Sequence, residues 1–86
     1  MSELGQSEKD LLLLGRAFRE IREQHGLSAG ELAGATGVDE ARIADLEEGR
    51  LDADYDLLLT LAQGIGVSAS AFFLRAEELE ATGAER

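Results

Sequence analysis

The feature that most constrains the fold is the way in which glycines end the first four runs of helically spaced apolar residues. Leu11, Leu14, Phe18 and Ile21 lie three or four positions apart, which places them on one face of a helix. Gly26 follows that run. Later runs end at three further glycines: Gly37, Gly49 and Gly66. No segment alternates apolar and polar residues as a strand does. The pattern predicts an all-α protein built from five short helices.

Residues that favour helix N-termini stand in front of these runs. Ser28 and Glu31 match the capping box, in which each side chain bonds the backbone of the other residue. Asp39 precedes the third run, where we expect it to cap the helix rather than to contact a ligand. The other candidate caps are Ser7 before the first helix, Asp52 or Asp54 before the fourth, and Ser68 before the fifth. Each helix therefore has a predicted start as well as a predicted end.

The 86 residues suffice for one small domain with one core. We divide the chain into an N-terminal extension and helix start (1–10), the helical domain (11–75), and an extension of helix five with a polar tail (76–86). Besides the first helix, the side chains expected inward are Leu32, Ile43, Leu46, Leu57, Leu58, Leu61, Ala62, Ile65, Ala71, Phe72, and either Leu74 or Leu79.

Several classes of function have no support in the composition. The chain has no cysteine and one histidine, His25, so neither a nucleophile–base pair nor a metal-ligand set can be assembled. We therefore expect no enzymatic activity, no metal and no cofactor. The longest apolar run, Leu11 to Leu14, is far too short to cross a membrane, and the acidic N-terminus is unlike a signal peptide. These features predict a soluble cytoplasmic protein.

Negative charge is concentrated in the middle of the chain. The formal net charge is −10, and residues 39–56 contribute −6 of it, with Arg42 and Arg50 set among eight Asp and Glu residues. Nucleic-acid binding usually needs clustered cations, so this charge taken alone argues against it. The local arrangement of caps and glycines, by contrast, favours nucleic-acid binding. A short capped helix, the turn 36–38 and a second capped helix follow the plan of a helix-turn-helix, whose second helix can enter a major groove.

The residues in and around this plan closely resemble the lambda-repressor-like helix-turn-helix domain of Cro/XRE-type regulators. The resemblance covers residues 12–74. It rests on Leu14-Gly15-Arg16, Ile21-Arg22, Gly26-Leu27-Ser28, Glu31-Leu32-Ala33, Gly37-Val38, Leu46-Glu47-Glu48-Gly49-Arg50 and Gly66-Val67-Ser68. It implies a DNA-binding transcriptional regulator whose recognition helix runs from Asp39 to Glu47. It also implies a structural ion pair between Arg22 and Glu47.

The same resemblance assigns the positions that would touch DNA. Those near base edges are Glu40, Ala41, Arg42 and Asp45. Ser28 and Ala29 stand where phosphate or base contacts are usually made, and Arg50 stands where a basic residue commonly meets a phosphate. Ala29 departs from the family, which often has glutamine there. Arg42 can donate two parallel hydrogen bonds to guanine, and Glu40 can accept a hydrogen bond from cytosine N4. The acids would repel phosphate, so we expect binding that is specific, weak and strongly salt-dependent.

Two adjacent apolar pairs suggest an interface. Leu12 and Leu13 cannot both face the core if Leu11 and Leu14 do, and neither can Phe72 and Phe73. We expect a homodimer through the start of helix one, helix five or both, on a short palindromic operator of double-stranded DNA. The alternative is that the fold serves as an acidic protein–protein interaction module with weak or no DNA binding, whose partner is another protein.

Overall fold

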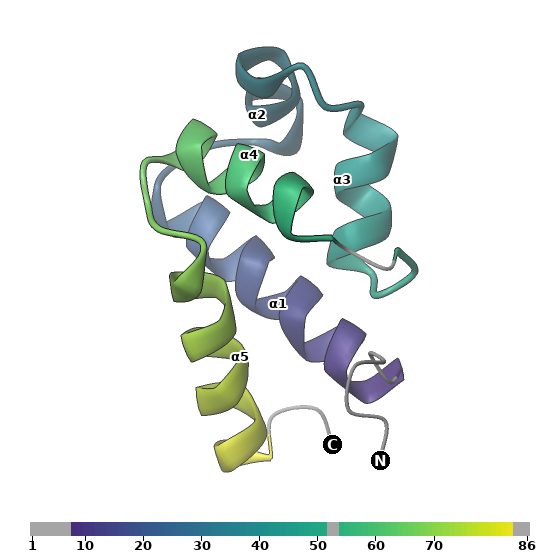
Figure 1. The fold of residues 1–86 in the computed structure, drawn as a ribbon, viewed down its shortest axis with the longest axis vertical. Coiled ribbons are helices and arrows are strands. Elements are labelled where there is room, and N and C mark those ends of the chain that lie inside the picture. The colour runs from purple at the N-terminus through teal and green to yellow at the C-terminus, as the bar shows by residue number, and fades with distance from the viewer. Residues whose placement is uncertain (1–7, 52–53, 84–86) are drawn as a thin grey trace.

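A computed structural model describes residues 8–51 and 54–83, which form five helices and no strand. The helices are α1 (Glu8–Gln24), α2 (Ala29–Thr36), α3 (Glu40–Glu47), α4 (Tyr55–Ile65) and α5 (Ser70–Thr82). Figure 1 shows α5 lying along α1, with α2, α3 and α4 gathered over the other part of α1. The all-α, five-helix prediction is confirmed.

Several helix ends lie where the sequence placed them. The Ser28 hydroxyl accepts from the Glu31 backbone amide at 3.0 Å, and the Ser28 amide donates to the Glu31 carboxylate at 2.9 Å, so the capping box is complete. Gly37 ends α2 in the left-handed conformation, with φ of 81°. At α4, the Asp54 carboxylate accepts from the Leu57 amide at 2.8 Å. Short-range hydrogen bonds thus fix the starts of α2 and α4.

Two predicted caps are wrong in their chemistry. Asp39 occupies the N-cap position of α3, but its carboxylate makes no capping hydrogen bond. The N-cap of α5 is Ala69 rather than Ser68, whose hydroxyl instead lies 3.0 Å from that of Ser70. Hydroxyl-to-hydroxyl pairing thus competes with capping at this site. Two other candidate caps fall outside the described residues: Ser7 and Asp52.

The main core draws buried side chains from all five helices. The rings of Phe18 and Phe72 are both fully buried and pack edge to face, with centroids 5.3 Å apart. The other buried members of this core are Leu14, Ile21, Leu32, Ile43, Leu46, Leu57, Leu58, Leu61, Ala62, Ile65 and Ala69. Nearly all of the residues predicted to point inward do so. Burial of this apolar surface is the main source of the domain's stability.

The inward face of the first helix differs from the prediction at its N-terminal end. Leu13 is buried and forms a second small cluster with Ala17 and Leu79, whereas Leu11 is only half-buried. The cause is α5, which continues to Thr82 and covers a second side of α1. Of the two alternatives predicted for α5, Leu79 therefore points inward beside Phe72, and Leu74 is 60% exposed.

Close approach of α1 to α3 depends on Gly15. A Cβ atom at this position would lie 2.3 Å from the backbone oxygen of Leu46 and 2.7 Å from that of Glu47. Only glycine fits there, because the obstacle is backbone and cannot rotate away. The contact fixes the end of α3 against the scaffold.

No single helix among the described residues is long and apolar enough to span a membrane. Together, α4 and α5 would have the length and the apolar composition, but the chain bends by 100° between them.

Candidate nucleic-acid interface

The turn between α2 and α3 is held by four hydrogen bonds. The Gly37 amide donates to the Ala33 carbonyl at 2.9 Å. The Thr36 hydroxyl donates to the Leu32 carbonyl at 2.8 Å and accepts from the Val38 amide at 3.2 Å. At the far side of the turn, the Arg42 amide donates to the Asp39 carbonyl, which begins α3. The two helices are therefore separate elements joined by a defined bend.

One face of α3 anchors it, and the opposite face meets solvent. Ile43 is fully buried and Leu46 nearly so. On the other side Glu40, Ala41 and Arg42 are exposed. Figure 1 shows α3 at the edge of the molecule, with no other helix across its outer side. A helix presented in this way is free to insert into a groove.

A buried ion pair joins α1 to α3 on the inner side of α3. The Arg22 guanidinium donates to both carboxylate oxygens of Glu47, at 2.7 and 3.2 Å, and a third bond reaches the Leu27 carbonyl at 2.7 Å. Each side chain of the pair is only 9% exposed. The hydrogen bond to Glu47 raises the pKa of Arg22, against the opposing effect of burial. The predicted structural pair is confirmed, and it positions the outer face of α3 rather than belonging to it.

The start of α2 lies beside the start of α3. A Cβ atom at Gly30 would be 3.5 Å from Oε1 of Glu40, so the Glu40 carboxylate lies over the first turn of α2. Ser28 is exposed and Ala29 is half-buried in this region. Three of the predicted site residues thus form one continuous surface: Ser28, Ala29 and Glu40.

At the other end of α3, the predicted phosphate contact is already paired with acids. The Arg50 guanidinium lies 3.2 Å from the Asp45 carboxylate and 2.5 Å from that of Glu48. The sequence placed Asp45 near bases and Arg50 near phosphate, and the structure joins them in one exposed ion pair. Glu48 was missed. Its adjacency to Arg50 across a glycine was the signal, since Gly49 has φ of 76° and turns the chain back.

Arg42 lies on a surface that also carries two acids from the start of α4. It lines a cavity of about 230 Å³ together with Asp54 and Asp56 from the start of α4. From the sequence, Asp54 was predicted only as a cap and Asp56 only as part of the negative charge of residues 39–56. Among residues 8–51 and 54–83, no group of three or more His, Asp or Glu side chains is arranged to hold a metal ion.

A short helix, a glycine turn and a second helix with an anchored inner face and an exposed outer face define a helix-turn-helix protein. A family model described as helix-turn-helix domain matches residues 13–72. The chain therefore belongs to the helix-turn-helix domain family, of the lambda-repressor-like, Cro/XRE type that its motifs resemble.

Solved structures agree with this family. The restriction–modification controller protein C.AhdI from Aeromonas hydrophila is 30% identical, with a TM-score of 0.72 over 74% of this chain and 97% of that one. The clp gene regulator ClgR from Corynebacterium glutamicum is 28% identical, with a TM-score of 0.81 over 92% and 82%. A helix-turn-helix transcriptional regulator from Vibrio cholerae is 27% identical, with a TM-score of 0.75, and this chain spans 42% of it. No curated protein matches the sequence.

Proposed function

We propose that this protein is a transcriptional regulator that binds double-stranded DNA in a sequence-specific way, with α3 as its recognition helix. The observation that carries the proposal is the exposed outer face of α3, held rigidly by buried Ile43 and Leu46 and by the Arg22–Glu47 pair. Further support comes from its similarity to C.AhdI and ClgR, which are gene regulators or controllers by description. The proposal involves no catalysis and no cofactor, and a chromosomal target implies a cytoplasmic location.

Within this proposal, four residues of α3 approach base edges: Glu40, Ala41, Arg42 and Asp45. Arg42 would donate two parallel hydrogen bonds to a guanine, and Glu40 would accept one from a cytosine amino group. Ala41 offers a small apolar surface, which suits the methyl group of thymine. We take residues 11–75 as the DNA-binding unit, with 1–10 and 76–86 as flanking segments.

Three residues would position the helix on the sugar–phosphate backbone: Ser28, Ala29 and Arg50. The Ser28 oxygen accepts from the Glu31 amide, which leaves its O–H free to donate to a phosphate. The Ala29 amide lies in the first turn of α2, where orphan N–H groups favour an anion. Arg50 would exchange its partners Asp45 and Glu48 for phosphate oxygens.

We also propose that two copies act together on a palindromic operator. Leu12 of α1 and Leu74 of α5 are 51% and 60% exposed, and an interface would cover them. Two-fold pairing would set two recognition helices about 34 Å apart along one face of the duplex. Light scattering at tens of micromolar tests this: we expect twice the chain mass, and a Leu74→Glu variant should reduce it to one chain. A parent mass of one chain contradicts the dimer.

The test of DNA binding is selection from a pool of random duplexes. We expect enrichment of a palindromic motif, with affinity that falls steeply between about 50 and 200 mM salt. Arg42→Ala should relax the preference at one base position, and Arg50→Ala should weaken all sequences evenly. Arg75→Ala is the matched control, because Arg75 of α5 pairs with Glu20 and Glu78, away from α3. If Arg42→Ala and Arg50→Ala both behave like this control, the assigned roles are wrong.

One observation favours the alternative, an acidic protein-interaction module. Both cations of the candidate interface stand beside carboxylates, Arg50 in ion pairs and Arg42 in a shared cavity. A surface of this kind offers little net attraction to phosphate and would suit a basic protein partner instead. The same selection distinguishes the two functions, since an interaction module enriches no DNA motif at any salt concentration.

A further inference from the structure

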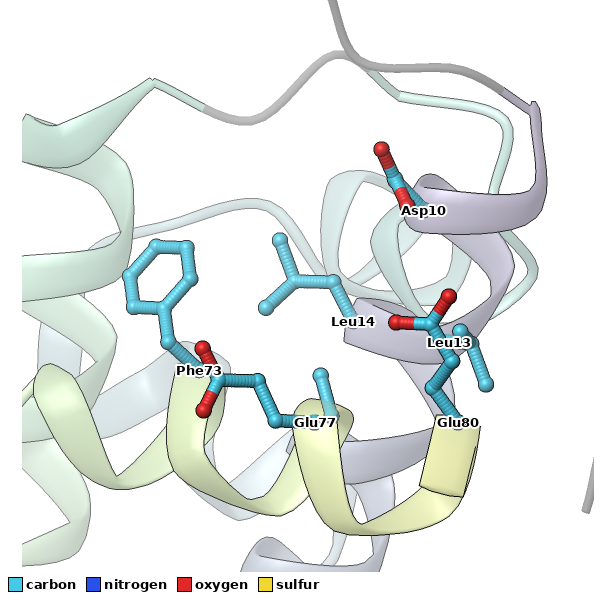
Figure 2. A pocket seen from close by; sticks show the side chains of 7 residues that line it. Asp10, Leu13, Leu14, Phe73, Glu77 and Glu80 are labelled. Atoms are coloured by element: carbon cyan, nitrogen blue, oxygen red, sulfur yellow. The ribbon is translucent and has the colours of Figure 1, made fainter. Parts of the chain in front are cut away.

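A groove separates the N-terminal half of α1 from α5, on a part of the molecule that the candidate DNA interface does not use. Its volume is about 290 Å³. Figure 2 shows the Phe73 ring facing the Leu14 side chain across it, with the carboxylates of Asp10, Glu77 and Glu80 around its margin. Leu13 and Ala76 complete the lining. The groove thus has an apolar floor and an acidic rim.

The floor is continuous with the core, and Phe73 is its exposed part. Leu13 and Leu14 are each 3% exposed, because they pack on α5 and on the main core. Phe73 is 40% exposed although phenylalanine is among the residues most often buried. Water therefore meets the Phe73 ring, an apolar surface that a partner could bury.

The rim determines which kind of partner fits. Glu77 has no ion-pair partner within residues 8–51 and 54–83, and Glu80 meets Lys9 at 3.3 Å, where both side chains are half exposed. Such an exposed pair contributes little and is easily exchanged. Two copies of this chain meeting face to face would confront two sets of three carboxylates. A cationic segment gains from the same three charges.

The size of the groove argues for side chains rather than a small molecule. Ligand pockets usually have volumes of about 300–1,000 Å³ and enclose most of the ligand. This groove is at the lower limit and has room for one or two apolar side chains. An amphipathic helix laid in a groove presents such side chains three or four residues apart, with charged neighbours beside them.

We propose that the groove between α1 and α5 docks a basic amphipathic helix of a partner protein, whose apolar side chains cover Phe73 and whose lysines or arginines pair with the acidic rim. Apolar contact supplies affinity, and the rim accelerates encounter and excludes acidic segments. This surface is independent of the recognition helix, so a partner bound there can join the protein while α3 is occupied. The inference does not depend on DNA binding.

The test uses the full chain and two synthetic helical peptides of about 18 residues with leucines at three- and four-residue spacing. In the first peptide the flanking residues are lysines, and in the second they are glutamates. We expect the lysine peptide to bind, to shift the NMR signals of α1 and α5, and to weaken as salt is added. The glutamate peptide should not bind. Signals that move only in α3 and α4 would overturn the proposal.

Variants make the test specific to the groove. Glu77→Lys should weaken binding of the lysine peptide about five- to ten-fold, since it removes an attraction and adds a repulsion. Glu23→Lys is the matched control, because it makes the same charge change at the C-terminal end of α1, and its effect should stay within about two-fold. Phe73→Ala should weaken binding about ten-fold through lost apolar contact. Equal effects at positions 77 and 23 would overturn the proposal.

A second copy of this chain is the other possible occupant. Light scattering decides between them: if Phe73→Ala converts a dimer to a monomer and the lysine peptide does not bind the parent chain, the groove belongs to the dimer and the proposal is wrong.

Discussion

Arg22 ties α3 to α1 by side-chain hydrogen bonds. Three hydrogen bonds tie it to Glu47 and to the Leu27 carbonyl in a nearly buried position. Truncating one member leaves the other charge without a partner, so we expect Arg22→Ala to lower the free energy of unfolding by about 3 kcal/mol. Urea denaturation measures this. Replacing both partners, as in Arg22→Met with Glu47→Leu, should cost less than the single change. A larger loss in the double variant would show that the ion pair itself stabilises the fold.

Replacing glycine by alanine should have opposite effects on stability at two helical positions. Gly15 faces backbone oxygens of α3 at distances that no Cβ can occupy, whereas nothing lies within 4 Å of a Cβ at Gly34. We expect Gly15→Ala to destabilise the protein by about 2–3 kcal/mol, because α1 and α3 must separate. Gly34→Ala should stabilise it by about 0.5–1 kcal/mol, because alanine is the better helix former. Thermal unfolding of both variants checks the contrast, and a Gly15→Ala protein as stable as the parent would contradict the observed approach of the helices.

Among the elements, α2 and α3 differ in how they begin. The Ser28 hydroxyl makes a capping bond, and the Asp39 carboxylate makes none. Ser28→Ala should therefore cost about 1 kcal/mol of unfolding free energy, whereas Asp39→Ala should cost about half of that or less. Urea denaturation of the two variants tests the difference. Equal losses would mean that Asp39 caps α3 in solution, as its sequence position alone suggests.

Whether a helix end or a buried face could be predicted depends on the range of the interactions that set it. Helix ends set by local hydrogen bonds were predictable, as at Ser28, Asp54 and Gly37. The buried face of α1 was predicted correctly for the residues that pack into the main core, but not for those that pack against the C-terminal half of α5. Leu13 is buried because α5 reaches the far end of α1, and no periodicity within α1 contains that information. Ser68 failed as a cap because Ser70 offers a competing hydroxyl.

The candidate site shows the same division. The positions of its residues on α2 and α3 followed from the motif, and the Arg22–Glu47 pair beneath them is confirmed. The pairing of Arg50 with Asp45 and Glu48 was not foreseen, since it depends on the direction in which the chain turns at Gly49. Whether the seven residues touch DNA remains part of the proposal.

For the molecule as a whole, charge decides how tightly the proposed interface can bind. The chain carries a net charge of −10, and only Arg42 and Arg50 offer cations among the residues proposed to face DNA. Because Arg50 is the cation assigned to a phosphate, one such contact per subunit predicts a log–log salt slope of about −1 per chain and about −2 per dimer. The dimer slope corresponds to roughly a ten-fold loss between about 50 and 200 mM salt.

Releasing Arg50 from its acids should strengthen binding. Glu48→Gln removes one negative charge beside the proposed phosphate contact and leaves Arg50 with Asp45 alone. A like charge about 4 Å from a phosphate costs roughly 1 kcal/mol in water, so we expect affinity for the selected operator to rise about five-fold at low salt. Fluorescence anisotropy measures the change.

Glu23→Gln is the control for this prediction. It removes an equal charge near the C-terminal end of α1 and should leave affinity within about two-fold, because salt screens the removed charge from the bound DNA. If Glu48→Gln weakens binding instead, Glu48 holds Arg50 in the orientation that phosphate needs, and the pair is part of the binding surface rather than a restraint on it.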